Sequence, residues 1–497
     1  MISSRFYHRR YFCTIMMVVN ILICPVSFVK ALGIFPPTDK SHQVQSLRDV
    51  VCRVLFVDVQ YPTPSTATLI LKSDHEWHCI MESLDDTVDG IRYVLSGMPK
   101  NFVSIHWAEL ISGGAVIEID IVGVTASKQD GYSMNIIAKS NVLLKRRRLK
   151  GRQKRKKQLP GLFDPNFRKE IRSVLVVRVG GIDTSVTNSL TELSDSVFGT
   201  FGKEQSLKSQ YDACSFGKLE FVQAEDKGIL HGVVRIIVPE VLSGVDTGYV
   251  LNKVKKIADG KIDLSEESYD HIIYCMPPGV LKQQKVWLAY AELGGQRSVV
   301  YDEWCGSLSA LMHEIGHNLG LYHAGMGNET YADASGYMGT SVLSSDGPLM
   351  CFNGAQSWQL GFYKDRHSTI PRAGLPWKKN LHGVSQYNLT RSRDTVIAKF
   401  VVNEGDGDLY FAFNLASGIN KGTRTSQNEV TIVKSDMRET SFIASLSSME
   451  TTKIKINGGK DELHINVTDI YVNNSNVDVL DYATIEIYLY EENVGMD

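Results

Sequence analysis

The apolar residues before position 320 recur every three or four positions, which is the period of a helix with one buried face. Ser307 is suited to cap the start of this helix, because a serine hydroxyl can accept a hydrogen bond from a free backbone N–H group. Gly320 is suited to end it, since glycine adopts positive φ without steric cost. The pattern therefore predicts a helix over about 308–319, and its apolar positions are Leu308, Leu311, Met312, Ile315 and Leu319.

Upstream of this helix, short runs rich in β-branched residues alternate with stretches of helical period. The runs predict strands at 171–179, 219–222, 233–238, 271–276, 286–293 and 298–301. Helices are predicted at 191–201 and 249–258, whereas 204–213 is too short and weakly periodic to assign. Interleaved strands and helices are typical of α/β layers. We therefore predict an α/β (α+β) domain over 156–366.

The regions on either side of this domain are richer in strands. Before it, strands are predicted at 51–59, 67–71 and 115–124, which indicates a small β-rich domain. After it, strands are predicted at 396–402, 409–414, 429–433, 452–456, 464–472 and 483–490. Short strands at regular spacing between turns predict a C-terminal β-sandwich domain over 367–497. Binding of glycan or matrix and simple stabilisation of the preceding domain both remain open as its role.

The first 31 residues have the layout of a secretory signal peptide. Arg5, Arg9 and Arg10 precede an apolar stretch over 12–29, and Val29 and Ala31 occupy the −3 and −1 positions of a cleavage site. An uncleaved signal anchor in the membrane is the alternative, because such a stretch could just span a bilayer. No other stretch of the sequence is long and apolar enough to cross a membrane. We expect a secreted protein without stable membrane insertion after signal removal.

Overall charge argues against nucleic acid as a partner, because the 497 residues carry a net charge of only −2. The exception is a basic run at 145–157, in which ten of thirteen residues are Lys or Arg. Arg152-Gln153-Lys154-Arg155 has the spacing that subtilisin-like processing proteases recognise, and 145–148 offers a second cut. We predict cleavage after Arg155, which makes 32–155 a propeptide; a permanent solvated linker or a polyanion-binding patch are the alternatives.

The cysteines fit secretion as well. Two of the eight lie in the predicted signal peptide, and Cys52 and Cys79 are expected to pair within the first small domain. The remaining four are expected to form two disulfides, in any of three pairings: Cys214, Cys275, Cys305 and Cys351. N-x-S/T sequons predict a glycoprotein, and they begin at Asn328, Asn388, Asn466 and Asn473.

The predicted 308–319 helix leads into a motif with metal-ligand spacing, His313-Glu314-Ile315-Gly316-His317-Asn318-Leu319-Gly320-Leu321-Tyr322-His323. His313 and His317 lie four residues apart, so both imidazoles project from one helical face. A turn at Gly320 lets the chain bring His323 back as a third ligand, while Glu314 can reach a metal-bound water. Three protein ligands and one open position are typical of a catalytic Zn²⁺ site. The alternative is a buried helix without a metal site, whose histidines are ordinary core residues.

This extended motif is that of the metzincin zinc peptidases, and its surroundings resemble the gametolysin (autolysin) family of secreted peptidases. The resemblance covers about 170–365. It rests on the stretches Ser209-Gln210-Tyr211-Asp212-Ala213-Cys214-Ser215-Phe216-Gly217, Met338-Gly339 and Cys351-Phe352-Asn353-Gly354-Ala355-Gln356-Ser357-Trp358-Gln359-Leu360-Gly361. It implies a metzincin-like catalytic domain that acts on proteins or glycoproteins of an extracellular matrix or cell wall.

The resemblance also implies further parts of the site. Metzincins place a methionine in a tight turn beneath the ligands, for which we choose Met338 over its rival Met350. Some relatives place a tyrosine two residues after that methionine; Thr340 stands there, so no tyrosine ligand is assigned. The strand before the helix, within 286–301, is expected to pair with extended substrate.

Together these observations predict a secreted zinc-dependent endopeptidase, expected to be a monomer. Glu314 is the expected general base for attack of a zinc-bound water on the peptide bond. Two alternatives remain: a non-catalytic matrix or adhesion protein that retains the zinc site, and a zinc hydrolase of another bond. Neither Cys52 nor Cys79 lies in the sequence context of a cysteine switch. We therefore expect the propeptide to maintain latency by filling the cleft.

Overall fold

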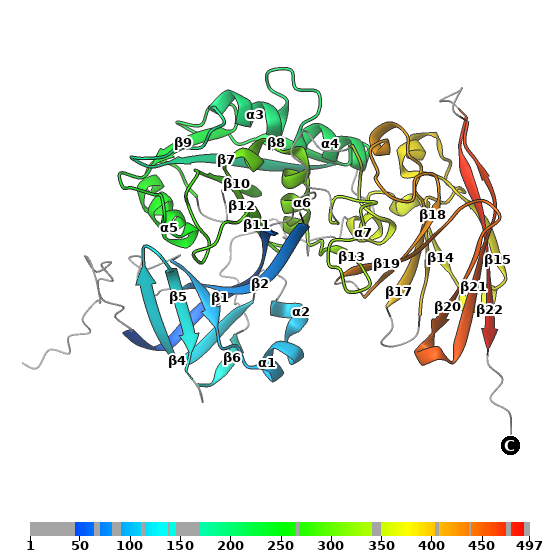
Figure 1. The fold of residues 1–497 in the computed structure, drawn as a ribbon, viewed down its shortest axis with the longest axis horizontal. Coiled ribbons are helices and arrows are strands. Elements are labelled where there is room, and N and C mark those ends of the chain that lie inside the picture. The colour runs from blue at the N-terminus through cyan, green and yellow to red at the C-terminus, as the bar shows by residue number, and fades with distance from the viewer. Residues whose placement is uncertain are drawn as a thin grey trace, which may run out of the picture. The chain divides into compact units, whose positions relative to one another are not determined.

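The computed structural model (Figure 1) describes residues 45–63, 70–81, 91–110, 115–137, 140–145, 169–264, 268–339, 349–402, 407–436, 439–473 and 479–491. All of these residues belong to one compact unit, which spans residues 37–497. The predicted signal peptide, Arg155 and Thr340 lie outside the described residues. No helix among the described residues is long and apolar enough to cross a membrane.

The central part of the chain is a mixed α/β layer. Its parallel strands are paired in the order β12–β10–β7–β8, with β9 also on β7, and β11 runs antiparallel to β12. The strands are β7 (Glu170–Gly180), β8 (Leu219–Gln223), β9 (Val233–Ile237), β10 (His271–Met276), β11 (Ala289–Glu292) and β12 (Arg297–Tyr301). The helices are α3 (Leu190–Phe198), α4 (Leu207–Ser215), α5 (Thr247–Ala258) and α6 (Leu308–Asn318).

Helices cover both faces of this layer, which explains the apolar character of β7 on both of its sides. Val174 and Val176 pack in the core formed with α3, α4 and α6, while Leu175 and Val177 pack in the core that holds α5. Successive side chains of a strand point to opposite faces, so a strand between two helical layers needs apolar residues at every position. The mixed α/β character predicted from the sequence is confirmed.

The N-terminal strands form a small closed barrel. Their order is β1–β2–β3–β5–β4, and β4 pairs back with β1; β3 and β5 are parallel, and two short helices lie between β3 and β4. This connectivity is that of a five-stranded OB-type barrel. Its elements are β1 (Gln45–Thr63), β2 (Ile70–Met81), β3 (Arg92–Ser96), α1 (Lys100–Ile105), α2 (Trp107–Leu110), β4 (Val116–Ser127), β5 (Gly131–Ile136) and β6 (Val142–Lys145).

Strand β1 is long enough to belong to two parts of the structure. Its first half pairs with β4, and its residues 57–60 pair antiparallel with β11 at the edge of the central layer. The barrel and the central layer therefore share one twelve-stranded sheet. Asp58 stands opposite Ala291 in this pairing, close to α6.

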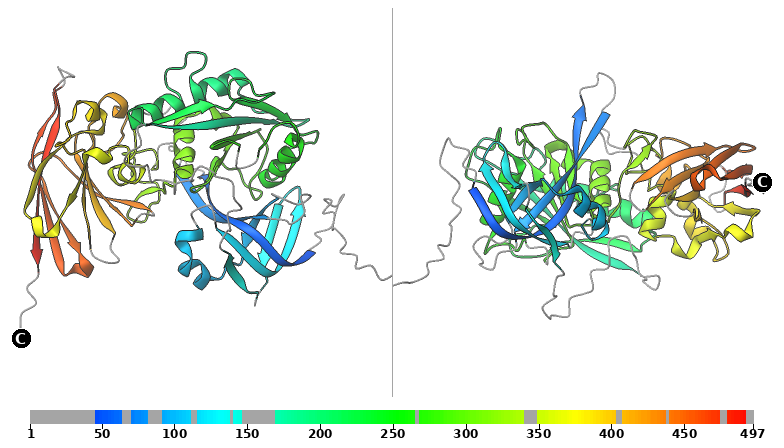
Figure 2. Two further views of the ribbon diagram at one scale, coloured as in Figure 1. Left: turned by 180° about the vertical axis from the view of Figure 1, so that it is seen from behind. Right: turned by 90° about the horizontal axis from the view of Figure 1, so that it is seen from below.

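The C-terminal strands form two sheets with a shared core. One has the order β13–β19–β18–β17–β16–β14, and the other β15–β22–β21–β20. Buried residues of both sheets, such as Phe411 and Ile485, belong to one apolar cluster, and the two views of Figure 2 show these strands (yellow to red) side by side. The strands are β13 (Ala324–Met326), β14 (His367–Ile370), β15 (Trp377–Leu381), β16 (Ile397–Phe400), β17 (Asp408–Phe413), β18 (Val430–Ser435), β19 (Thr440–Leu446), β20 (Thr451–Ile456), β21 (Asp461–Tyr471) and β22 (Tyr482–Glu491).

Two links connect this part to the central one. One is helix α7 (Gly354–Leu360), within the last of the stretches on which the family resemblance rests, which contacts β17 and β18. Strand β13 begins directly after His323 and pairs with β19, more than a hundred residues later in the chain. The predicted boundary at 366/367 therefore separates strands that belong to one sheet, and the division into domains stays a prediction.

Within the described residues, three disulfides are present: Cys52–Cys79, Cys214–Cys351 and Cys275–Cys305. The first agrees with the expected pairing, and the other two are one of the three pairings left open. Cys275–Cys305 ties β10 to the short 3-10 helix before α6. None of the three joins the N-terminal barrel to the rest of the chain.

Candidate metal centre

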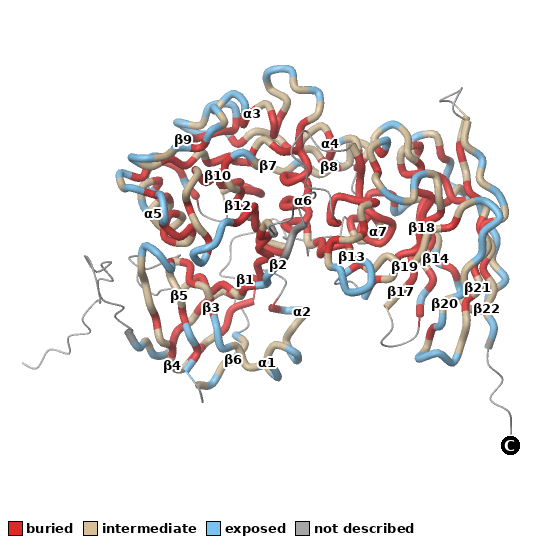
Figure 3. The backbone as a smooth tube through the Cα atoms, in the orientation of Figure 1, coloured by how far each residue is buried: buried red, intermediate tan, exposed pale blue. Residues whose placement is uncertain are grey.

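Helix α6 is built as its sequence predicted. The Ser307 hydroxyl accepts a hydrogen bond from the Ala310 backbone N–H, and Gly320 has a φ of +89° at the turn that follows. Every residue of α6 is buried, as the red tube in Figure 3 shows. A helix that is buried all round places its polar side chains against protein groups rather than solvent, so each of them requires a partner.

The chain brings the three motif histidines together. His313 and His317 extend from neighbouring turns of α6 with their ring centroids 4.8 Å apart. After the turn, Leu321 donates a backbone hydrogen bond to Gly316, which folds the chain back against the helix. The His323 ring then lies 5.4 Å from that of His313 and 4.9 Å from that of His317.

Hydrogen bonds from the protein fix the orientation of two of these rings. His313 Nδ1 lies 2.8 Å from the Tyr337 carbonyl oxygen, and His317 Nδ1 lies 2.8 Å from that of Leu321. A ring that donates through Nδ1 presents an unprotonated Nε2, which is the form that binds a metal. All three Nε2 atoms are buried and make no well-formed hydrogen bond among the described residues; the polar group near two of them is the Asp58 carboxylate described below. One metal ion bound between them would satisfy all three nitrogens at once.

The electrostatics of the histidines agree with a ligand role. Burial and the neighbouring histidines hold the pKa of His313 well below its ordinary value, and burial lowers the pKa of His323. Both rings therefore stay neutral in the physiological range, as metal ligands must.

Glu314 lies beside the ligands on α6 and is almost completely buried. Neither carboxylate oxygen has a hydrogen-bond partner among the described residues. Burial, followed by the charge of Asp58, raises the pKa of Glu314 well above its ordinary value. A carboxylate in such surroundings has a high affinity for a proton, which is the property a general base needs.

A fourth side chain reaches the same point from far away in the sequence. Asp58 Oδ2 lies 2.9 Å from His323 Nε2 and 3.5 Å from His317 Nε2, and the potential ligand atoms of Asp58 and the three histidines lie within 4.8 Å of one another. This residue was not predicted from the sequence. The sequence feature that could have pointed to Asp58 is its position as a lone carboxylate inside the buried apolar run of β1. A buried charge is rare without a partner, so such a residue suggests a nearby cation or hydrogen-bond donor.

Met338 packs on the helix between the two histidines. A Cβ atom at Gly316 would overlap the Met338 sulfur, so the glycine makes room for the thioether one residue before His317. The Met338 carbonyl accepts a hydrogen bond from Ala324, next to His323. Met350, the rival, is also fully buried, but its carbonyl accepts a hydrogen bond from Gln210 on α4.

Residues of the 209–217 and 351–361 stretches, on which the resemblance rests, form hydrogen bonds to α6 and to the turn that follows it. Tyr211 donates from its hydroxyl to the Met312 carbonyl on α6. Gln356 donates to the Tyr322 carbonyl, and Gln359 donates to that of Gly320. These amides therefore fix the turn that carries His323.

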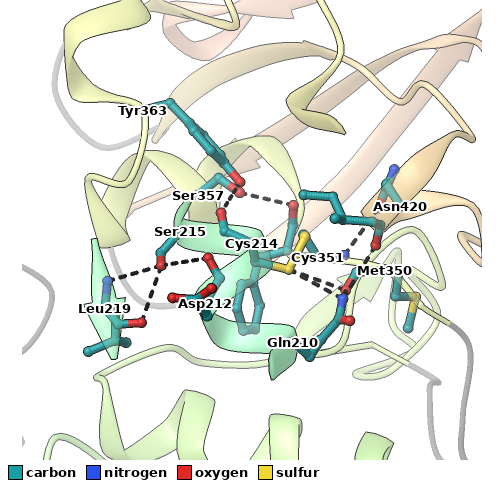
Figure 4. Close-up of a disulfide and its surroundings, with 12 residues drawn as sticks. Gln210, Asp212, Cys214, Ser215, Leu219, Met350, Cys351, Ser357, Tyr363 and Asn420 are labelled. Atoms are coloured by element: carbon teal, nitrogen blue, oxygen red, sulfur yellow. Dashed lines mark hydrogen bonds between the residues drawn. A yellow bond between two sulfur atoms is a disulfide. The ribbon is translucent and has the colours of Figure 1, made fainter. Parts of the chain in front are cut away.

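The Cys214–Cys351 disulfide joins the first and last of these stretches (Figure 4). Around it, Gln210 reaches the Met350 carbonyl, Tyr363 donates to the Cys214 carbonyl, and Asn420 accepts from the Cys351 backbone N–H. Most of the residues that identify the resemblance are thus structural partners of the metal centre and not parts of it.

Comparison with known proteins gives two matches. Residues 174–402 match the family described as gametolysin peptidase M11. The protein named autolysin from Chlamydomonas reinhardtii is 33% identical over 98 residues, which cover 18% of this chain and 15% of that protein. The matched family implies a metallopeptidase. The resemblance to the gametolysin family, expected from the motifs around the histidines, is therefore confirmed for residues 174–402.

Proposed function

We propose that the protein is a zinc-dependent endopeptidase and that Glu314 is its general base. The observation that carries the proposal is the convergence of three buried imidazoles on one point, next to the buried Glu314 carboxylate, which makes no hydrogen bond among the described residues. A site with three protein ligands and one further position is characteristic of catalytic zinc. The match to a peptidase family supports hydrolysis of a peptide bond in preference to other chemistry.

His313, His317 and His323 would hold the Zn²⁺ ion. When bound, zinc would polarise the scissile carbonyl and make a water molecule more acidic. Met338 would form the apolar floor beneath the ligands, where its contact with Gly316 fixes the spacing of α6 against the turn.

Glu314 would perform the proton transfers. Its carboxylate takes a proton from the attacking water as the C–O bond forms, and then delivers that proton to the amine as the C–N bond breaks. Burial raises the pKa of Glu314, which strengthens its carboxylate as a proton acceptor.

Extended substrate would pair with β11. This strand lies within the predicted 286–301 edge, and in the uncleaved chain its free side is taken by β1. Proteins or glycoproteins of an extracellular matrix or cell wall are the substrate class that we propose, and no observation favours a nucleic-acid partner or a stable oligomer.

We propose secretion with processing: removal of 1–31 as a signal peptide and of 32–155 after cleavage at Arg155. Three disulfides support an oxidising compartment, and the sequon residues Asn328 and Asn388 are exposed to modification. Sequencing the N-terminus of secreted, active protein tests the processing, and we expect it near Lys156. Full activity with residues 32–155 still attached would contradict it.

Digestion of casein and of a peptide library tests the chemistry. Processed protein should release new peptide termini, lose this activity to a zinc chelator, and regain it when Zn²⁺ is returned. Mass spectrometry of the products shows which bond is cut. Zinc-dependent cleavage of ester or glycosidic bonds with peptide bonds intact would refute the proposal, as would zinc binding without any hydrolysis.

A further inference from the structure

The N-terminal barrel places one side chain, Asp58, beside the candidate metal ligands. Strand β1 crosses from the barrel to β11 and places Asp58 opposite Ala291, so the strand follows the edge on which substrate would lie. Asp58 is only 3% exposed, and one of its oxygens faces His317 and His323. A carboxylate buried against these histidine rings would be costly unless a cation joined them.

Side chains from the barrel and from the segment after β13 fix the position of the Asp58 carboxylate. His75 on β2 lies 3.1 Å from Oδ1, and its ring stacks on Phe56 at 5.0 Å. The Tyr331 hydroxyl lies 3.5 Å from Oδ2. Contacts of this kind hold a ligand in one orientation and are typical of a metal centre with an ordered outer shell.

We propose that Asp58 is the fourth metal ligand in the uncleaved chain, and that the barrel is a built-in inhibitor whose strand β1 occupies the place of the substrate. This inference rests on the proposed function of the same site. It assigns latency to a carboxylate ligand, whereas the sequence predicted only that the propeptide fills the cleft. While Asp58 holds the fourth position, neither the reacting water nor the scissile carbonyl can take it.

The barrel also has anchors that lie away from the metal centre. Glu76 on β2 accepts hydrogen bonds from Lys282 and Gln283, each at 2.7 Å, and both charged groups of the Glu76–Lys282 pair are buried. Arg92 on β3 forms a buried ion pair with Glu292 of β11. Phe56 contributes an apolar contact to the small cluster that includes Leu293 and Tyr322.

These anchors bear on activation. Since no disulfide among the described residues joins the barrel to the later part of the chain, cleavage in the basic run would leave it held there by noncovalent contacts. The ion pairs and the apolar contact do not depend on the connecting segment, so they remain when it is cut. Cleavage alone should therefore leave the chain latent until the barrel dissociates or is degraded.

The test uses the full-length chain loaded with Co²⁺, whose visible absorption reports the ligand set, and acetohydroxamate as a probe for an open coordination position. Wild type should show a spectrum that responds little to acetohydroxamate. Asp58→Asn and Asp58→Ala should still bind cobalt, with altered spectra, and should bind acetohydroxamate at least about tenfold more tightly. Asp74→Asn is the matched control, because Asp74 is an exposed carboxylate in the same sheet and should behave as wild type.

A second measurement covers the case in which the Asp58 variants fail to fold. Wild-type chain is cleaved in the basic run and passed over a size-exclusion column. The two fragments should co-elute and remain insensitive to acetohydroxamate, whereas Lys282→Met should release the barrel fragment and open the site.

The outcomes separate the inference from the proposed function. Equal spectra and equal acetohydroxamate affinity in wild type and folded Asp58→Ala would overturn the inference, as would immediate separation of the cleaved wild-type fragments into a probe-sensitive enzyme. Cobalt binding with the expected Asp58 effect, but no hydrolysis after release of the barrel, would support the inference and refute the proposed function.

Discussion

The metal centre draws on two regions that differ in how far apart their contributions lie in the sequence. Residues 313–323 supply three histidines and a glutamate within eleven positions, and one helix and one turn suffice to bring them together. The barrel supplies a single aspartate from 255 positions before His313, which reaches the site only through the pairing of β1 with β11. Ligands with short sequence spacing can be predicted from the sequence, whereas a residue that reaches the site through long-range strand pairing cannot.

The largest expected effect comes from the region with local spacing. Glu314→Ala in the processed protein should lower hydrolysis by ~10²–10⁴-fold, because it removes the proposed general base. Zinc content should stay near one equivalent, since Glu314 is not proposed as a ligand. Atomic absorption and a peptide assay on the same sample measure both quantities. Unchanged turnover would show that another group accepts the proton, and loss of the metal would show that Glu314 acts as a ligand.

The next largest effect concerns the attachment of the barrel. Lys282→Met should destabilise the full chain by about 3–5 kcal/mol, because it leaves the Glu76 charge buried without its cation. Lys378→Met, which removes the exposed lysine of the surface pair with Glu486, should cost far less, because solvent screens that pair. Urea unfolding of both variants makes the comparison. Adding Glu76→Gln to Lys282→Met should restore part of the loss, and failure to do so would mean that packing, and not charge, accounts for it.

The same cluster should give the barrel a dependence on pH. Burial, together with Lys282 and Arg92, lowers the pKa of His78 to about 4 despite its contact with Glu76. The unfolded chain takes up this proton below pH ~6.5 while the folded chain does not, so His78 should reduce stability as the pH falls from ~6.5 towards ~4. At ~1.4 kcal/mol per unit the loss is up to about 3 kcal/mol.

Glu76 should also make the barrel less stable as the pH falls, but in a second, lower pH range. Its pKa is about 2: burial raises it, but Lys282 and His78 outweigh burial. Its contribution to stability is complete above the ordinary value of 4.5 and is lost as the pH falls towards 2. Melting temperatures between about pH 8 and 3 should show the two windows in sequence, and His78→Gln should flatten the first. A profile that is flat between about pH 6.5 and 4 in the wild type would contradict the assignment to His78.

The smallest effect should come from the floor of the site. Met338→Leu should retain zinc and part of the activity, and should cost under ~1.5 kcal/mol, because the swap nearly conserves volume. Gly316→Ala should be far worse, since its Cβ would overlap the Met338 sulfur. Thermal unfolding and zinc content of both variants test this ranking. If Met350→Leu alone disturbed zinc binding, Met350 and not Met338 would be the residue beneath the ligands.

The sequence predicted most of the central layer and the geometry of α6, because helical and strand periods are local properties. It missed β2 over most of its length, since Glu76 and His78 are polar residues that face buried partners and break the apolar alternation. It also missed β15, whose central residues are exposed and carry little pattern.

The closed barrel could not be read from the sequence either, because its order depends on the pairing of β3 with β5 and of β4 with β1. For the site, the structure brings the three predicted histidines together. The roles of Glu314, Met338 and the histidines stay predictions.

Strand β13 has a practical consequence for anyone who shortens this protein. Thr440 donates its backbone N–H to the His323 carbonyl at 3.1 Å, directly before β13 pairs with β19. The Asn353 amide, at the start of α7, also contacts the Thr440 hydroxyl. A truncated chain ending at 366 would keep every predicted ligand and still lose strand β19, whose Thr440 holds the His323 backbone. Exchanging the C-terminal part between relatives would remove the same contacts. The C-terminal part therefore supports the structure of the candidate metal centre, and we do not expect it to be separable from it.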